Sequence, residues 1–313
     1  MRPSSTAGTI NPICSRIDTS VKVVQVSTPP VPSQDATRNR LLPPALMLVS
    51  GTSMYVGAAA GVFLFSYIAP AGVAWLRILG AALILLAVVR PARTAWQGRA
   101  LVLAAAFGTI TALMNISFYE AIARLPLGTA VAIEFLGPIL VAAWGSRSLR
   151  DVVALLVAGA GIVLIADVHL AGSPLGIVFA LLAALCWAGY IILGKRVAGA
   201  GTPRESLAVG FTVAAVLTSP FALTIVLSWQ PDTPLLPVLT LGLALGLFAN
   251  VIPYGLDQVI LRKAGQAYFA VLLALLPVSS AVIGWLILDQ SLAPAEIVGI
   301  TAVALAVALR RPG

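Results

Sequence analysis

Apolar stretches separated by short polar segments make up most of this 313-residue chain. From about residue 43 to residue 309 they form ten segments of roughly 18 to 23 residues, the length that an α-helix needs to cross about 30 Å of hydrocarbon. The segments cover residues 44–65, 71–89, 100–120, 127–145, 152–168, 174–194, 206–228, 235–256, 267–288 and 293–309. This pattern predicts an all-α membrane protein with ten transmembrane helices.

Residues 1–42 differ from the remainder of the chain. They are rich in Ser, Thr and Pro, carry charges of both signs and contain no apolar run of signal-peptide length. We interpret them as a disordered cytoplasmic tail. A translation start near Met47 is the alternative.

Composition excludes an ordinary soluble protein. The chain is 60% hydrophobic and 10% charged, whereas soluble domains carry about 25% charged residues. The net charge of +8 could suggest a nucleic-acid partner, but the basic residues lie in loops and no base-reading motif is present. We therefore expect a lipid bilayer as the surroundings and no nucleic acid as a partner.

The distribution of basic residues predicts the orientation. If the N-terminus is cytoplasmic, all but two of the 19 basic residues lie on the cytoplasmic side. The exceptions are Arg124, in an outer loop, and Arg77, within the second apolar segment. The positive-inside rule thus favours a multi-pass protein of a bacterial cytoplasmic (inner) membrane with both termini in the cytoplasm.

The two halves of the chain resemble each other at a spacing of about 135 to 139 residues. We assign residues 43–169 to a first five-helix repeat and residues 173–311 to a second. An odd number of helices in each half makes the second repeat inverted, as in many secondary transporters. The matching positions are Asn115 and Asn250, Arg124 and Arg262, and Pro138 and Pro277.

Few residues could support enzyme chemistry. His169 is the only histidine, and neither Cys14 nor Cys186 has a neighbouring cysteine partner. No nucleophile–base pair, metal-ligand spacing or nucleotide-binding loop is present. We expect no enzyme activity, no metal and no cofactor, which disfavours an intramembrane enzyme, and a structural subunit is disfavoured as well.

Glu134 is the leading candidate for a substrate or proton site. It lies near the middle of the fourth apolar segment, where a carboxylate costs several kcal/mol unless it is partnered or hydrated. Pro138, four residues later, cannot donate to the carbonyl of Glu134, so we predict a helix break there, and a second one at Pro277. The alternative is a protonated structural carboxylic acid bonded to a neighbouring helix.

Arg77 is the natural opposite charge for Glu134. It lies about two turns below the predicted outer end of the second segment, so pairing is one prediction. The alternative is that its side chain extends to the outer interface.

Other polar and aromatic residues could line the same cavity. Asn115 and Tyr119 share a helix face at a spacing of four, and Asn250 and Tyr254 repeat that spacing. Packing hydrogen bonds between helices explain these pairs equally well. We add two aromatic residues, Trp187 and Tyr190, as candidates for one end of a solute cavity, although core packing also accounts for them.

Three parts of the sequence resemble the EamA branch of the drug/metabolite transporter superfamily. They are the run from Leu125 to Pro138, the run from Cys186 to Lys195 and the neighbourhood of Trp75 to Arg77. Within that branch the chain is most similar to bacterial threonine/homoserine exporters. The resemblance spans roughly residues 45 to 309, and Glu134, Pro138, Trp187 and Arg77 match recurring positions. In the second half Leu276 precedes Pro277 where the exporters tend to have Glu.

The resemblance implies two inverted five-helix repeats around a central cavity, and export of amino acids or related metabolites in exchange for protons. Glu134 would bind a proton or the ammonium group, and Arg77 would bind the carboxylate or keep Glu134 ionised. A multidrug or aromatic-metabolite exporter on the same fold is the alternative. The sequence leaves the exact substrate and homo-oligomerisation open.

Overall fold

The computed structural model describes residues 34–145, 149–169, 173–199, 203–229, 234–257, 259–260, 272–273 and 275–309. Within these ranges the chain is almost entirely helical and contains no β-strand. The all-α prediction is therefore confirmed. Most of the predicted tail, residues 1–33, lies outside the described part of the chain.

The first half begins with α1, which starts at Gln34 and so includes the last residues of the predicted tail. Its helices are α1 (Gln34–Phe63), α2 (Pro70–Val89), α3 (Gly98–Ile122), α4 (Leu127–Glu134), α5 (Leu136–Gly145) and α6 (Leu149–His169). Short 3-10 turns, η1 (Leu64–Ser66) and η2 (Arg93–Trp96), lie in the two loops that flank α2.

The described part of the second half is also built from helices. It comprises α7 (Pro174–Gly199), α8 (Pro203–Leu217), η3 (Ser219–Phe221), α9 (Ala222–Ser228), α10 (Leu235–Gly246), the π-helical turn η4 (Leu247–Val251), α12 (Leu275–Leu288) and α13 (Pro294–Leu309). Pro220 lies in η3, where α8 and α9 are bent by 53°. A proline interrupts helical hydrogen bonding, which explains a bend at this place.

Five helical segments of the described chain are long and apolar enough to cross a membrane, and a sixth is obtained if the bent pair α8–α9 counts as one span. The other predicted segments appear as shorter apolar helices, among them Leu127–Val141, Leu275–Leu288 and Pro294–Ala306. The chain is thus a helical membrane protein by length and composition.

The helix break predicted at Pro138 stays a prediction: α4 and α5 are separated by one residue, Phe135, which keeps helical backbone angles. α4 ends at Glu134, Phe135 separates the two helices, and α5 begins at Leu136, so that Pro138 is the third residue of α5. Pro277 likewise is the third residue of α12, which begins at Leu275. Both prolines therefore lie in the first turn of a helix, where the missing N–H costs least.

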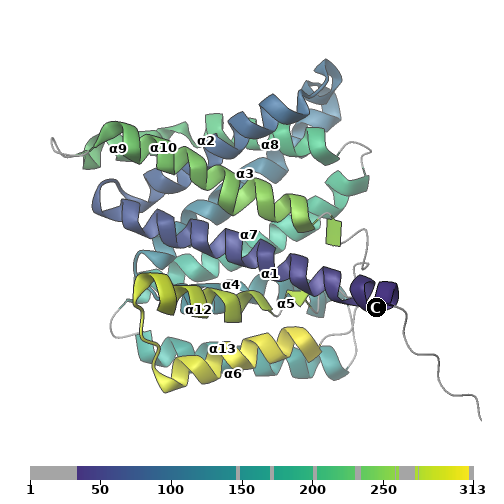
Figure 1. The fold of residues 1–313 in the computed structure, drawn as a ribbon, viewed down its shortest axis with the longest axis vertical. Helices are drawn as coiled ribbons and strands as arrows, with labels where there is room; N and C mark the ends of the chain where they lie inside the picture. The colour runs from purple at the N-terminus through teal and green to yellow at the C-terminus, as the bar shows by residue number, and fades with distance from the viewer. Residues whose placement is uncertain are drawn as a thin grey trace, which may run out of the picture.

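The helices lie side by side in a layered bundle (Figure 1). The pair α6 and α13 forms one edge, and α2, α8, α9 and α10 form the opposite edge. Between them α3 packs on α7 and α8, α1 packs on α12, and α7 packs on both α4 and α5. This arrangement places α2, α3, α4, α7 and η4 around the centre of the molecule.

Glycines permit the closest helix crossings. A Cβ at Gly108 of α3 would collide with the carbonyl oxygen of Gly210 in α8, and one at Gly80 of α2 would collide with the carbonyl oxygen of Leu243 in α10. Close backbone approach through small residues is the usual way to pack membrane helices. The α3–α8 and α2–α10 crossings therefore depend on these positions.

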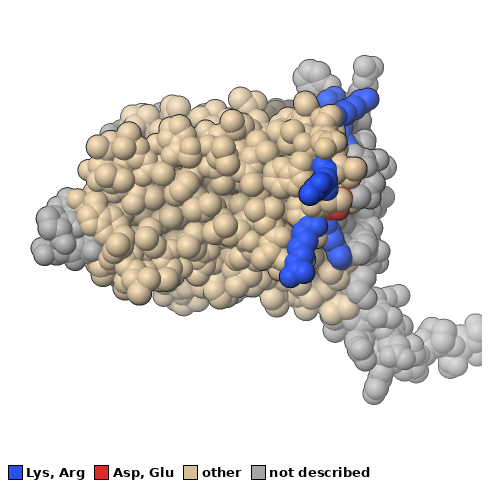
Figure 2. Space-filling view, turned by 90° about the horizontal axis from the view of Figure 1, so that it is seen from above, with Lys and Arg blue, Asp and Glu red and all other residues tan. Residues whose placement is uncertain are grey.

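Charged side chains are segregated. On the face shown in Figure 2 the described Lys and Arg side chains gather at one end of the bundle. Exposed arginines mark this end at the terminus of α2 (Arg90), in η2 (Arg93) and near the start of α3 (Arg99). α1 begins and α13 ends at the same end of the bundle (Figure 1).

Candidate functional site

Arg77 is buried in the centre of the bundle, with 5% of its surface exposed. Its Nε donates to Oδ1 of Asn250 at 2.9 Å, and its Nη2 donates to the carbonyl oxygen of Ala249 at 2.9 Å. The alternative in which the side chain extends to the outer interface is therefore wrong. Arg77 instead joins α2 to η4.

The acceptors of Arg77 are supplied by the π-helical turn η4. A π-turn shifts hydrogen bonding from i→i+4 to i→i+5, so it changes which carbonyls the helix itself uses. Two carbonyls here accept from side chains of other helices: Phe248 from Ser53 Oγ at 2.7 Å, and Ala249 from Arg77. Such turns are frequent at functional sites.

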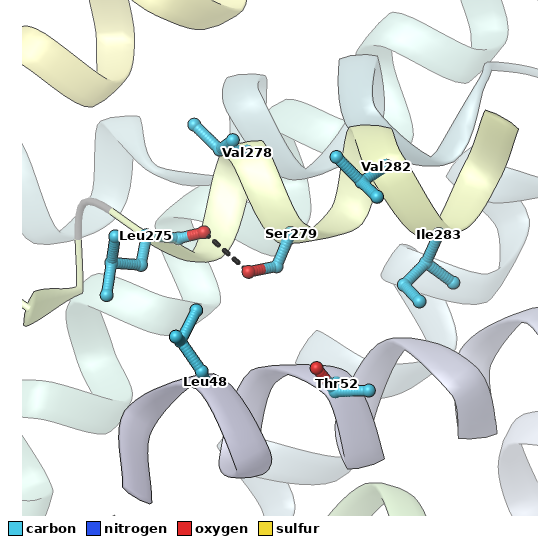
Figure 3. Close-up of a pocket in the computed structure, with 7 residues that line it drawn as sticks. All are labelled: Leu48, Thr52, Leu275, Val278, Ser279, Val282 and Ile283. Carbon is cyan, nitrogen blue, oxygen red and sulfur yellow. Dashed lines mark hydrogen bonds between the residues drawn. The ribbon is translucent and has the colours of Figure 1, made fainter. Parts of the chain in front are cut away.

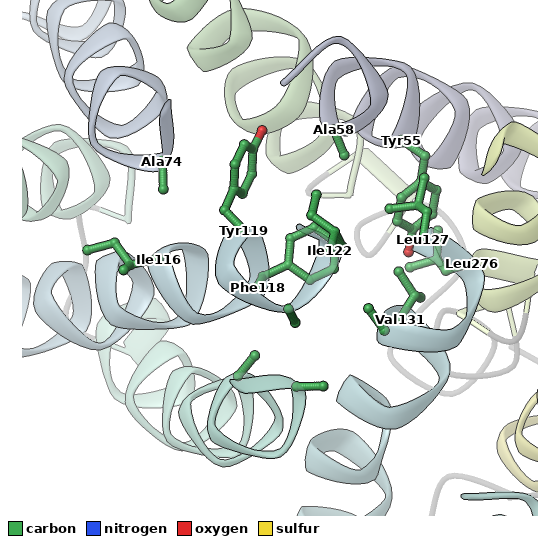
Figure 4. Packing of buried hydrophobic residues seen from close by; sticks show 14 of the residues in the cluster. Tyr55, Ala58, Ala74, Ile116, Phe118, Tyr119, Ile122, Leu127, Val131 and Leu276 are labelled. Atoms are coloured by element: carbon green, nitrogen blue, oxygen red, sulfur yellow. The ribbon is translucent and has the colours of Figure 1, made fainter. Parts of the chain in front are cut away.

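Tyr119 of α3 lies beneath the guanidinium of Arg77. The Arg77 Cζ atom is 5.4 Å from the centroid of the Tyr119 ring, within the range of a cation–π contact. Figure 4 shows Tyr119 extending from its helix toward the core. The fully buried ring packs edge-on against Phe65 and Phe118.

Two polar atoms next to Arg77 are buried without a hydrogen-bond partner in the described part of the chain. They are the hydroxyl oxygen of Tyr119 and Nδ2 of Asn250. A buried polar group without a partner costs about 1–3 kcal/mol, so each one requires an explanation. Here both occur in the same cluster, beside a buried cation.

Glu134 is the last residue of α4 and is 8% exposed. Its charge lies within electrostatic range of Arg77, Tyr55 and Tyr254. Among the described residues, however, its carboxylate forms no ion pair and no hydrogen bond. The proposed direct pairing with Arg77 is therefore absent, because Arg77 is bonded to η4.

Aromatic rings pack against one another between α4 and α7, next to Glu134 in the sequence. The ring of Phe135, the next residue, meets Trp187 of α7 edge-on with centroids 4.7 Å apart. Tyr190 lies one turn further along α7. The centroid of its ring is 4.9 Å from that of Phe107 and 5.9 Å from that of Tyr254. Tyr190 thus contacts Phe107 of the first half of the chain, and Tyr254 from the same half as itself.

The two matched asparagines are used differently. Asn250 accepts from Arg77, whereas Asn115 donates from Nδ2 to the carbonyl oxygen of Thr111 in its own helix at 2.7 Å. Asn115 is buried one turn from Tyr119 but joins no other helix through that bond. Its predicted role in binding remains a prediction.

Sequence reasoning missed two carboxylates that connect helices. Asp257 accepts from Ser50 Oγ at 3.0 Å and so joins the helical segment after η4 to α1. Glu296 is 3% exposed, accepts from Thr129 Oγ1 at 2.6 Å and also accepts from the backbone N–H of Ala293. The signal that could have identified Glu296 is its place three residues after the start of an apolar run, typical of an N-terminal cap.

A shallow recess of about 260 Å³ lies between α1 and α12, away from these polar groups (Figure 3). Leu48, Val278 and Val282 in its wall are each nearly half exposed. The remaining lining residues are Thr52, Leu275, Ser279 and Ile283. The recess is open to the outside of the bundle and contains none of the predicted site residues.

Known proteins resemble this chain over most of its length. The threonine/homoserine exporter RhtA of Escherichia coli (strain K12) is 32% identical over 271 residues, which cover 84% of this chain and 88% of the exporter. The exporter of the same name from Salmonella typhimurium (strain SL1344) is 31% identical over 273 residues, with the same coverage.

Two further comparisons agree with this. One crystal structure shares the fold, with a TM-score of 0.55 and 17% identity, covering 87% of this chain and 96% of the other. Residues 174–310 match the model of the EamA-like transporter family. Because of this family match and the similarity to RhtA over most of its length, the chain belongs to the EamA-like transporter family within the drug/metabolite transporters.

Proposed function

We propose that this protein is a secondary transporter that exports small amino acids or related metabolites, with threonine and homoserine as the first substrates to test. The observation that carries this proposal is 32% identity to a threonine/homoserine exporter across 84% of the chain. The buried polar cluster around Arg77 and Glu134 agrees with it, since charged residues inside a membrane bundle usually mark a solute or proton path.

We further propose ten transmembrane helices in two inverted repeats. In this scheme the members of the first repeat pair in chain order with those of the second. The pairs are α1 with α7, α2 with α8–α9, α3 with α10–η4, α4–α5 with α12, and α6 with α13. The packing supports it, because exchanging the halves turns the α3–α8 contact into α2–α10, and the α1–α12 contact into α7 with α4–α5. The α6–α13, α2–α8 and α4–α12 contacts each map onto themselves.

Glu134 is the group through which protons would be coupled to export. An ionised carboxylate binds the ammonium group of an amino acid, whereas a protonated one does not. Protonation of Glu134 from outside would therefore release the solute, and deprotonation to the cytoplasm would restore the site. Glu134 ends α4 one residue before α5 begins, and in this proposal the two helical segments reorient there.

The test is efflux of labelled threonine and homoserine from preloaded cells that express the protein. We expect faster efflux than from cells with an empty vector, and loss of that gain in Glu134→Gln, which retains size but cannot ionise. Membrane content of the variant is measured alongside as the control. Wild-type efflux by Glu134→Gln would contradict the role of the carboxylate, and growth protection only against toxic organic cations would favour a multidrug exporter.

A further inference from the structure

We propose that Arg77, Asn250 and Tyr119 form a subsite for the carboxylate of the substrate, separate from Glu134. This inference rests on the proposed export function and specifies the chemical class of solute: one with a free carboxylate. It starts from hydrogen-bonding groups that the protein leaves unused at the centre of the bundle.

The orientation of the Asn250 amide is fixed by its partner. Arginine can only donate hydrogen bonds, so the atom that faces Arg77 Nε at 2.9 Å has to be the amide oxygen. The amide nitrogen is therefore left as a donor, and it has no acceptor among the described residues. Asn250 itself is 1% exposed, so bulk water does not satisfy it.

Arg77 and Tyr119 add further donors to the same place. Nε and Nη2 of Arg77 are bonded to η4, and neither of these two bonds uses its remaining nitrogen, Nη1. The Tyr119 ring lies under this guanidinium, and its hydroxyl is also without a partner. Three side chains from α2, α3 and η4 thus present unused N–H and O–H groups.

A ligand for this cluster has to supply hydrogen-bond acceptors and negative charge. A carboxylate offers about four lone-pair sites and accepts well from guanidinium, amide and phenol groups. It would also offset the buried charge of Arg77, whose two bonded acceptors are neutral. A cationic solute would instead be repelled.

Glu134 provides a negative charge near the donor cluster without being bonded to it. Its carboxylate is in electrostatic range of Arg77 but is not bonded to it. An α-amino acid carries its ammonium and carboxylate groups on the same Cα atom, so a donor cluster and a separate carboxylate could bind one group each. Asp257 is held by Ser50 and lies toward the end of the next helical segment.

A purely structural role for the cluster makes a different prediction. Arg77 already joins α2 to η4 through Nε and Nη2, and neither the Tyr119 hydroxyl nor Asn250 Nδ2 contributes to that connection. Deleting these two groups should therefore leave folding intact if they serve a ligand. Tyr119 and Asn250 are therefore the positions at which a substitution distinguishes ligand binding from a structural role.

The experiment measures binding to the purified full-length protein. Small L-amino acids, including threonine, homoserine and glycine, are titrated beside their carboxamides, which keep the ammonium group but lack the carboxylate. We expect the wild-type protein to bind the acids at least about tenfold more tightly than the amides, because hydrogen bonds to charged groups are worth that much or more. Tyr119→Phe and Asn250→Asp should each reduce this preference about tenfold without lowering the temperature of thermal unfolding.

Thr111→Val is the matched control. It also removes a buried hydroxyl from α3, but one that bonds the carbonyl of Phe107 in its own helix, and it should keep the preference for acids. If Tyr119→Phe does not fold, Asn250→Asp carries the test, because aspartate keeps the acceptor for Arg77. Equal binding of acids and amides by the wild type, or a full preference in both variants, overturns the subsite. A preference for acids without export in cells keeps the subsite and rejects the export function.

Discussion

At the scale of single residues, Arg77 depends on the shape of its side chain as well as on its charge. A guanidinium can donate to Asn250 Oδ1 and Ala249 O at the same time, whereas lysine provides a compact point charge. We expect Arg77→Lys to lose one of these buried bonds and to lower the free energy of unfolding by about 1–3 kcal/mol. Thermal unfolding in detergent and efflux, which should fall about tenfold, measure the effect.

Arg90→Lys is the matched control for that prediction. Arg90 is exposed, and its Nε donates to the carbonyl of Ala87 in the preceding turn of the same helix. The same substitution there should change neither unfolding nor efflux. If Arg77→Lys behaves like Arg90→Lys, the two bonds to η4 contribute nothing measurable.

The sequence identified the charged residues of the site but not their partners. Glu134 and Arg77 could be predicted because charge in an apolar segment is costly. The bond between Arg77 and Asn250 joins residues 173 positions apart, and no local pattern encodes such a distance. Asn115 and Asn250 have the same spacing to a tyrosine, yet one bonds its own helix and the other bonds Arg77.

At the scale of helices, proline positions were the most informative part of the sequence. α4 gives way to α5 shortly before Pro138, whose missing N–H removes one helical hydrogen bond. Pro220 interrupts helical hydrogen bonding between α8 and α9 for the same reason. The π-turn η4 could not be predicted, because its residues Leu247–Val251 would also suit a regular α-helix. It is instead stabilised by Ser53 and Arg77 from other helices.

The α3–α8 crossing provides a test of helix packing. Gly108→Ala would place a methyl group onto the backbone of Gly210, and because backbone cannot move aside easily, the helices have to separate. We expect the free energy of unfolding to fall by about 1–3 kcal/mol, the usual cost of overpacking. Thermal unfolding of the purified protein gives the comparison.

Gly159→Ala in α6 serves as the control for that substitution. Apart from the backbone of its own helix, no atom of the described residues lies within 4 Å of a Cβ built at Gly159, and alanine favours a helix over glycine. It should leave stability unchanged or raise it. A Gly108→Ala protein as stable as the wild type would show that the crossing tolerates a wider separation.

At the scale of the whole molecule, the bilayer makes the chain's architecture unusually predictable. Because unpaired backbone groups are costly in hydrocarbon, long apolar segments have to be helical, as they are in the described part of the structure. The order of packing among these helices depends on side-chain contacts such as Gly108 with Gly210, which hydropathy does not reveal. Hydropathy therefore predicts the elements, and small residues and buried polar groups decide their neighbours.

The orientation in the membrane can be tested across a single helix. Tyr67 follows η1 and is 40% exposed, Thr94 lies in the exposed turn η2, and α2 between them is about 30 Å long. In a protein whose native cysteines are replaced, we expect a membrane-impermeant maleimide to label Tyr67→Cys in intact cells. Thr94→Cys should be labelled only after permeabilisation, because the arginines near η2 favour the cytoplasmic side.

The reverse labelling pattern would place the arginine-rich end of the bundle outside, and the positive-inside assignment would then be wrong. It would also invert the direction in which protonation of Glu134 could drive the solute, although the helix packing would be unchanged. Orientation and fold are therefore independent claims. The labelling decides the first, whereas the effect of Gly108→Ala on unfolding bears on the second.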